Sequence, residues 1–236
     1  MRYEIRVMRI LHIIPTAFNY FDTIKGFAFQ IVELQNDLGV YADAITLQYS
    51  AKDAGREKSK NLRDFAKARE DIKLGKKPKI PPLKYQGVQA LHKSVSNFSD
   101  YDIIHLHAPF LGAGSEIFNW KRRNPEKKLV VSYYNGLDNE DLFGFFIKLY
   151  NAYYLPKLFR LADLVIGIDG SGFMKTPASR YLKDYKKLVF MIDSSVDESG
   201  LTLNENEVKL DNQRLKQIVQ SMLASYLELL KQQINI

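Results

Sequence analysis

The stretch "YDIIHLHA", residues 101–108, decides the fold of this chain. It is short and almost continuously apolar up to its two histidines, which is typical of a strand covered on both faces of a parallel sheet. Parallel strands are joined by long crossover connections that usually contain a helix. The sequence on either side of this stretch should therefore alternate between strands and helices.

Five further segments have the same character and predict the other strands. They are "RILHIIP" (9–15), "YADAITLQ" (41–48), "LVVSYY" (129–134), "DLVIGID" (163–169) and "LVFMID" (188–193). Helical patterns fill four of the gaps, at about 27–38, 114–124, 141–162 and 171–184, and Gly39 stands where the first of these helices should end. The alternation predicts a doubly wound, mostly parallel, Rossmann-like α/β sheet with helices on both faces.

The domain organisation follows from where this alternation stops. Residues 1–197 are expected to form one Rossmann-like domain, and residues 198–210 read as a linker without apolar periodicity. Residues 211–236 carry an apolar stripe at helical spacing and predict a final helix that packs back on the same domain. Residues 49–100 are the least regular part, with a short helix expected near 87–97.

Composition excludes several classes of protein. Apolar residues make up 46% of the chain and charged residues 26%, as in globular proteins, and cysteine is absent. The chain therefore has no disulfide framework, thiolate metal site or cysteine nucleophile. Glu4, Arg6 and Arg9 interrupt the N-terminal apolar run, so we expect no secretory signal there. No run of 18 apolar residues occurs, so we expect no membrane-spanning helix. Together these features predict a cytoplasmic protein.

The net charge of +7 comes from one segment, residues 52–84, which holds 12 Lys/Arg and 5 Asp/Glu. This segment is either a solvated basic face or a surface for an anionic membrane at the inner face of the bilayer. Exposed aromatics among Phe143, Phe145, Phe146 and Tyr150 would add interfacial contact in the second case. Nucleic acid is disfavoured as a partner, because no aromatic residues are interleaved with the charge as a stacking platform.

His105 and His107 lie on the same face of the predicted strand, but only His107 is at its tip. Because α/β sheets bind ligands outside the carboxyl ends of their strands, His107 is the candidate functional residue and His105 is expected in the core. A metal site is not expected. The other two histidines, His12 and His92, lie in an early strand and a distant helix, and no carboxylate is at ligand spacing.

The exit of the first strand lacks the glycine-rich turn of a dinucleotide site. A G-x-G-x-x-G motif would be expected there in a nucleotide-dependent oxidoreductase, and only Gly26 is present. This argues against the oxidoreductase alternative. No G-x-S-x-G, P-loop or H-E-x-x-H motif occurs elsewhere.

The order of these motifs resembles a known family. The segments "MRILHIIP", "KGFAFQIVELQNDLG", "YDIIHLHAP", "LVVSYYNGLD", "LADLVIGID" and "LVFMIDSSVD" resemble, in order and spacing, the N-terminal half of family 4 glycosyltransferases over about residues 8–197. Enzymes of that family have the GT-B fold, in which two Rossmann-like domains face each other and the acceptor binds mostly to the first. The resemblance implies that this chain is one GT-B half.

The resemblance also implies roles for particular residues. His107 matches the second histidine of the family's "HLH" motif, near the acceptor, and would be the catalytic contact. Gly26 matches the second glycine of the loop that approaches the donor phosphates. Tyr134 stands where the family has a histidine, and Tyr134 and Asn135 are expected to bind substrate. The family's E-x7-E glutamate pair, which belongs to the donor domain, is absent.

The function expected from the resemblance is acceptor binding in a retaining glycosyltransferase. The nucleotide sugar would be the donor substrate of the complete enzyme, no cofactor is needed, and the acceptor would be a small molecule or a lipid-linked one. Because the donor-binding domain is missing from the sequence, the chain is expected to be inactive alone. The alternative is a non-catalytic binding or scaffold subunit that works with a separate donor-domain chain.

Overall fold

The computed structural model describes residues 8–15, 22–46, 98, 100–110, 114–134, 142–182, 187–192 and 212–234. The strands are β1 (Arg9–Ile14), β2 (Tyr41–Thr46), β3 (Ile103–Ala108), β4 (Lys128–Tyr133), β5 (Leu164–Asp169) and β6 (Leu188–Ile192). The helices are α1 (Asp22–Asp37), α4 (Gly114–Arg123), α5 (Leu142–Tyr153), α6 (Leu155–Leu161), α7 (Gly170–Lys175), the 3-10 helix η3 (Pro177–Tyr181) and α8 (Asn212–Ile234). The basic segment 52–84, the helix expected near 87–97 and the linker 198–210 lie outside the described residues.

The six strands form one sheet in the order β2-β1-β3-β4-β5-β6, and every pair is parallel. This confirms the predicted doubly wound, Rossmann-like α/β fold. The direction of strand progression reverses between β1 and β3. In this fold the reversal is the topological switch point, where a crevice forms outside the carboxyl ends of the two strands.

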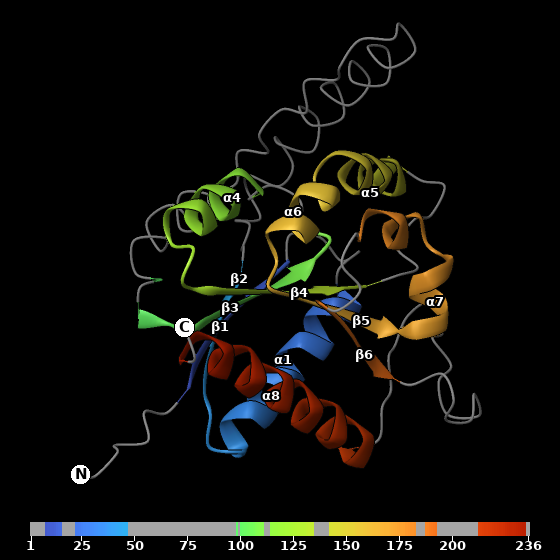
Figure 1. The fold of residues 1–236 in the computed structure, drawn as a ribbon. Coiled ribbons are helices and arrows are strands. Elements are labelled where there is room, and N and C mark those ends of the chain that lie inside the picture. Colours follow the sequence, from blue (N-terminus) through green and yellow to red (C-terminus); the bar gives the residue numbers. More distant parts are fainter. Residues whose placement is uncertain are drawn as a thin grey trace, which may run out of the picture.

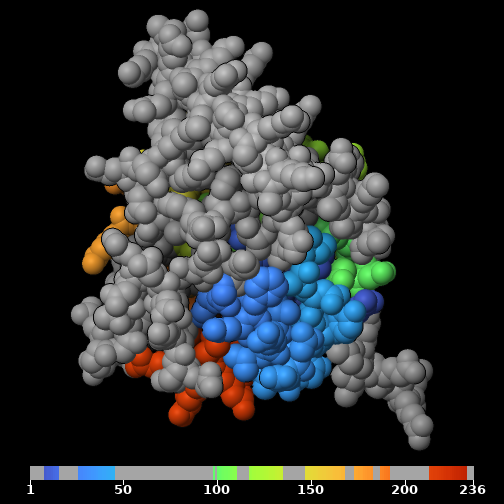
Figure 2. All heavy atoms as spheres, turned by 180° about the vertical axis from the view of Figure 1, so that it is seen from behind, coloured from blue at the N-terminus to red at the C-terminus, as the bar shows by residue number. Residues whose placement is uncertain are grey.

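Handedness of the crossovers explains how the helices are distributed. Right-handed connections place α1 on one face of the sheet and α4 to α7 on the other, because the strands progress in opposite directions from the switch point. The face that carries α1 would be uncovered over β3 to β6. The 23-residue helix α8 lies there beside α1, below the sheet in Figure 1, while α4, α5 and α6 lie above it. Seen from behind, the blue surface of α1 adjoins the red surface of α8 (Figure 2).

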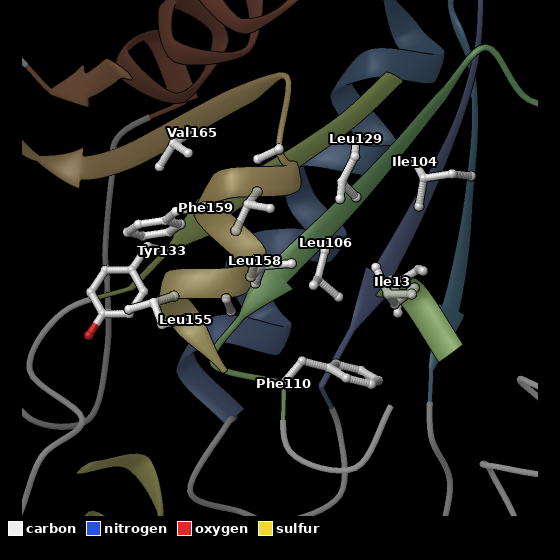
Figure 3. Packing of buried hydrophobic residues seen from close by; sticks show 14 of the residues in the cluster. Ile13, Ile104, Leu106, Phe110, Leu129, Tyr133, Leu155, Leu158, Phe159 and Val165 are labelled. Atoms are coloured by element: carbon white, nitrogen blue, oxygen red, sulfur yellow. The ribbon is translucent and has the colours of Figure 1, made fainter. Parts of the chain in front are cut away.

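Side-chain alternation along the strands separates the core into two layers. The layer toward α4 to α7 is apolar, and Figure 3 shows Leu155, Leu158 and Phe159 of α6 pointing onto strand residues such as Leu129 and Leu106. The layer toward α1 and α8 is also mostly apolar and includes Leu215, Ile218 and Met222 of the stripe on α8. That second layer differs in one respect, because it also contains a cluster of polar side chains that are 0% exposed.

The helix expected over 141–162 is divided into α5 and α6. Tyr154 separates them, and Pro156 occupies the first turn of α6, where its missing N–H has no helical acceptor to lose. Tyr150 lies in the core and is 5% exposed, so it is not one of the exposed aromatics that the membrane alternative would use. The side chains of Phe143, Phe145 and Phe146 lie outside the described part of the chain. A search of the helices in the described ranges finds none that could span a bilayer.

Gly39 ends α1, as the sequence predicts. Its φ of 82° is in the left-handed region, and the N–H groups of Gly39 and Val40 donate to the carbonyls of Asn36 and Gln35, both at 3.0 Å. This bond pattern is a Schellman motif, which satisfies two of the carbonyls left free at a helix end.

We expect the substitution Gly39→Ala to destabilise the fold by about 1 kcal/mol, because a Cβ is strained at positive φ. Chemical denaturation would measure the change in free energy of unfolding. The matched control is Gly26→Ala, at an exposed position inside the same helix where a Cβ meets nothing within 4 Å. The control should be neutral or stabilising. Equal effects at the two glycines would contradict the argument.

Candidate functional site

A cluster of buried polar side chains lies between the sheet and the helices α1 and α8, at the switch point. His12, His105, His107, Gln35 and Ser132 are each 0% exposed. The register of the sheet brings the histidines together, because His12 of β1 is directly opposite His105 of β3. The imidazoles of His105 and His107 stack with centroids 4.3 Å apart. Buried polar groups must find hydrogen-bond partners inside the protein, and these residues find each other.

One row of hydrogen bonds runs from α1 across the switch point to the end of β4. The Nε2 of His12 lies 2.8 Å from Oε1 of Gln35, and its Nδ1 lies 3.0 Å from Nε2 of His107. The Nδ1 of His107 lies 2.7 Å from the hydroxyl of Tyr134, which follows β4. Four residues, one each from α1, β1, β3 and the position after β4, therefore form one continuous chain.

His105 forms a second row beside the first. Its Nε2 lies 2.7 Å from the hydroxyl of Ser132 on β4, and its Nδ1 lies 2.7 Å from the hydroxyl of Tyr226 on α8. These bonds fix the C-terminal helix to the centre of the sheet by a polar contact as well as by apolar packing. The Nε2 of Gln35 makes no hydrogen bond with a described residue. Burial raises the pKa of Tyr226, and the nearby Gln35 side chain lowers it by a smaller amount.

Burial holds all three imidazoles in the neutral form. It lowers the pKa of His12 to about 4, against a smaller opposing effect of the hydrogen bond to Gln35. The pKa values of His105 and His107 are lowered well below the usual range by burial, and a charge on a neighbouring imidazole lowers them further. Burial also raises the pKa values of Tyr134 and Tyr226, so both phenols are neutral.

The proton positions in the first row follow from Gln35. An amide oxygen only accepts, so with the Gln35 amide in this orientation Nε2 of His12 carries the proton and its Nδ1 accepts. His107 must then donate from Nε2 and accept at Nδ1, and Tyr134 must donate its hydroxyl proton to His107. The phenol oxygen of Tyr134 keeps its lone pairs for a further hydrogen bond from outside the row.

The prediction that His12 lies apart from His105 and His107 is wrong. Nitrogen atoms of the three side chains come within 4.8 Å of one another, a grouping that could hold a metal ion. However, all six imidazole nitrogens already have hydrogen-bond partners, and Nε2 of His105 is bonded to β4 instead of facing His12. A metal would have to displace at least one of these bonds, so the geometry favours a hydrogen-bonded network.

The structure brings three of the four predicted site residues to one region. His107 is the fifth of six residues in β3, close to the carboxyl end, and it bonds to Tyr134. Gly26 lies in α1 and not in a preceding loop, and Phe27 beside it contacts the ring of Tyr134 at a centroid distance of 6.2 Å. Asn135 lies outside the described residues. His105 is buried behind His107, as predicted.

Sequence reasoning missed His12, Gln35, Ser132 and Tyr226 as members of this region. The ring of Tyr226 belongs to the apolar stripe expected over 211–236, but its hydroxyl bonds to His105. His107, the candidate for ligand contact, is 0% exposed, and both its nitrogens are engaged by protein partners. Tyr134, at 8%, is the most exposed of the four residues in the row from Gln35.

Comparison with known proteins adds no further assignment. No protein-family model matches the chain, and no curated protein matches its sequence.

Proposed function

We propose that this chain is the acceptor-binding half of a retaining glycosyltransferase with the GT-B fold, and that the nucleotide sugar binds to a separate donor-binding half. The observation that carries the proposal is the location of the Tyr134–His107–His12 row at the switch point of a parallel sheet. Ligands of open α/β sheets bind outside the carboxyl ends of the strands at this point. The order of sequence motifs, which resembles that of family 4 enzymes, supports the same function.

In this proposal Tyr134 contacts the acceptor, and His107 positions the phenol of Tyr134. The phenol oxygen donates its proton to His107, so it can accept a hydrogen bond from a sugar hydroxyl. His107 and His12 hold the phenol in place, and Gln35 sets the direction of the bonds. Holding the acceptor hydroxyl in a fixed position against the anomeric carbon of the donor lowers the barrier to transfer, because the reacting atoms are already oriented.

Gly26 completes the proposed site from α1. It is exposed, and a Cβ added to it would meet no atom within 4 Å. No packing inside the described structure therefore accounts for a glycine here. Close approach of a ligand to the start of α1 would account for it, since the free N–H groups of the first four residues, 22–25, directly precede Gly26 and favour an anion such as a donor phosphate.

A bulky residue at Gly26 tests the proposed site without disturbing the core. We expect Gly26→Trp to abolish the binding of acceptors, because Gly26 is next to Phe27, whose ring contacts that of Tyr134, the proposed acceptor contact. Ligand-observed NMR with a panel of mono- and disaccharides and lipid-linked sugars would measure this. The control is Glu33→Trp, an exposed position two helical turns further along α1. The control should bind as the native chain does. Equal binding by both variants would place the ligand elsewhere and contradict the proposal.

The isolated chain should not bind nucleotide sugars with micromolar affinity, because in this proposal all donor contacts other than the phosphate approach beside Gly26 belong to the other half. Calorimetry with a panel of UDP- and GDP-sugars would measure this. Saturable micromolar binding would contradict the division of labour between the halves. Acceptor binding without any sugar transfer, even when a donor-domain partner is added, would favour the non-catalytic scaffold.

A further inference from the structure

A hollow lies at the opposite edge of the sheet, away from the polar row. It has a volume of about 230 Å³ and is formed by α6, η3 and the residue that precedes β6. Lys187 lies directly before β6, and Arg160 lies in the last turn of α6, just before β5. A five-residue strand is about 16 Å long, so this hollow at the amino ends of the strands is separate from the carboxyl edge.

The lining of this hollow is basic, and none of the described residues that form it is acidic. Arg160, Arg180 and Lys187 contribute the charges. Arg160 and Arg180 are exposed, and neither has a hydrogen-bond or ion-pair partner among the described residues. Lys187 is half-buried, and its Nζ donates to the carbonyl of Ala162 at 3.1 Å, which holds its charge at the wall. Three positive charges in one concave site favour an anion.

Apolar side chains form the floor of the hollow. Phe159 is 2% exposed and Leu182 is 4% exposed, and Pro156 and Tyr181 add apolar surface beside them. The volume is below the range of about 300–1,000 Å³ found for pockets that hold drug-sized ligands. The hollow therefore suits a small anionic group attached to an apolar or ring-shaped part.

Both walls of the hollow are anchored in the core, so little ordering is needed on binding. Leu155, Leu158 and Phe159 fix α6 to the sheet, as Figure 3 shows. The turn that leads into η3 is held by side-chain hydrogen bonds, from Thr176 Oγ1 to the Phe173 carbonyl at 2.7 Å and from Ser179 Oγ to the Thr176 carbonyl at 2.9 Å. Preorganised groups lose less entropy when a ligand binds.

We propose that this hollow is a binding site for a phosphate monoester, held by the guanidinium groups of Arg160 and Arg180 and by Lys187. One guanidinium group can donate two parallel hydrogen bonds to two oxygens of a phosphate, and it remains charged at every physiological pH. The apolar floor receives the group that is esterified to the phosphate. The same chemistry is offered by a soluble phosphorylated metabolite and by the headgroup of a phosphatidic-acid-like lipid.

The test compares two double variants that lose the same charge. Arg160→Gln with Arg180→Gln removes both guanidinium groups of the hollow, while Arg123→Gln with Lys157→Gln removes two exposed charges outside it. The probes are phenyl phosphate, measured by calorimetry at fixed ionic strength, and vesicles of phosphatidylcholine with or without phosphatidic acid, measured by co-sedimentation. Thermal unfolding should be the same for both variants and the native chain, since all four side chains are exposed.

We expect the first double variant to bind the phosphate probe at least about tenfold more weakly, because charge-assisted hydrogen bonds are lost. The control should bind as the native chain does. Loss of binding to phenyl phosphate identifies a soluble ligand, and loss of binding to phosphatidic acid vesicles alone identifies a lipid. Absence of saturable binding to both probes, or equal weakening in both variants, would overturn the proposal.

Discussion

Lowering the pH from about 7.5 to about 4.5 is expected to destabilise this protein by several kcal/mol, because it contains three buried neutral imidazoles. The pKa of His12 is lowered to about 4 in the folded chain, against about 6.5 in an unfolded one. The neutral form is therefore the one that the fold stabilises. Its contribution is fully present above pH 6.5 and is lost as the pH falls toward 4.

The size of this effect follows from the number of protons involved. In the window from about pH 6 to about pH 4.5, the unfolded chain holds a proton on each imidazole that the folded chain does not, so the free energy of unfolding falls by up to about 4 kcal/mol per pH unit. His12 alone contributes on the order of 3 kcal/mol over its whole range. His105 and His107 act in the same direction, since burial lowers their pKa values as well.

Denaturant titrations at a series of pH values would measure the slope, and His12→Gln should reduce it by about one third, since one of three imidazoles is removed. Comparing the two chains in the same buffers cancels the contribution of carboxylates. NMR of the native chain provides a second measurement, in which the imidazole signals of His12, His105 and His107 should not titrate before the protein unfolds. Titration of these imidazoles near pH 6.5 without loss of stability would contradict the burial argument.

The second large effect is expected at Lys121, which is 7% exposed and holds three segments together. Its Nζ lies 2.8 Å from Oδ2 of Asp163 and donates to the carbonyls of Pro125, at 2.9 Å, and Lys127. The same Asp163 oxygen accepts the N–H of Leu129 at the start of β4. The end of α4 is thereby tied to the beginnings of β4 and β5.

We expect Lys121→Met to lower the free energy of unfolding by about 3 kcal/mol, because it leaves the Asp163 carboxylate without its counter-charge and two carbonyls without their donor. Asp163 is 23% exposed, so water compensates part of the loss and keeps the cost at the lower end for a buried pair. Chemical denaturation would measure the change. The matched control is Lys216→Met, an exposed lysine on α8, which should change stability little. Similar losses in both variants would show that the charge itself, and not the contacts, matters.

The fold could be predicted from the sequence because its signal is local. Each strand is a short apolar run of its own. Gly39 marks the end of α1 because the local backbone there has a positive φ, which does not depend on distant contacts. The division of α5 from α6 was missed even though Pro156 marks it. An apolar pattern that continues through 141–162 masks a break of one residue, and a proline in the first turn of a helix is compatible with either interpretation.

The candidate site was less accessible to sequence reasoning because its contacts join distant segments. His12 and His107 are 95 residues apart, and they meet because β1 and β3 are neighbours with a particular register. Neither the neighbour relation nor the register can be read from either strand alone. The hydroxyl of Tyr226 reaches His105 only because α8 crosses the uncovered face of the sheet. The resemblance to a family directed attention to His107 but gave no indication of these partners.

The position of α8 has a consequence for the time course of synthesis. Tyr226 follows His105 by 121 residues, so a ribosome that adds about 5–20 residues per second completes the partner of His105 about 6 to 24 seconds later. Strands β4 to β6 are added within that interval, and until α8 follows them no described helix covers β3 to β6 on this face, so its apolar side chains remain available to chaperones. Burial of this face, and with it the neutral state of His105, is completed only when the last helix has been translated.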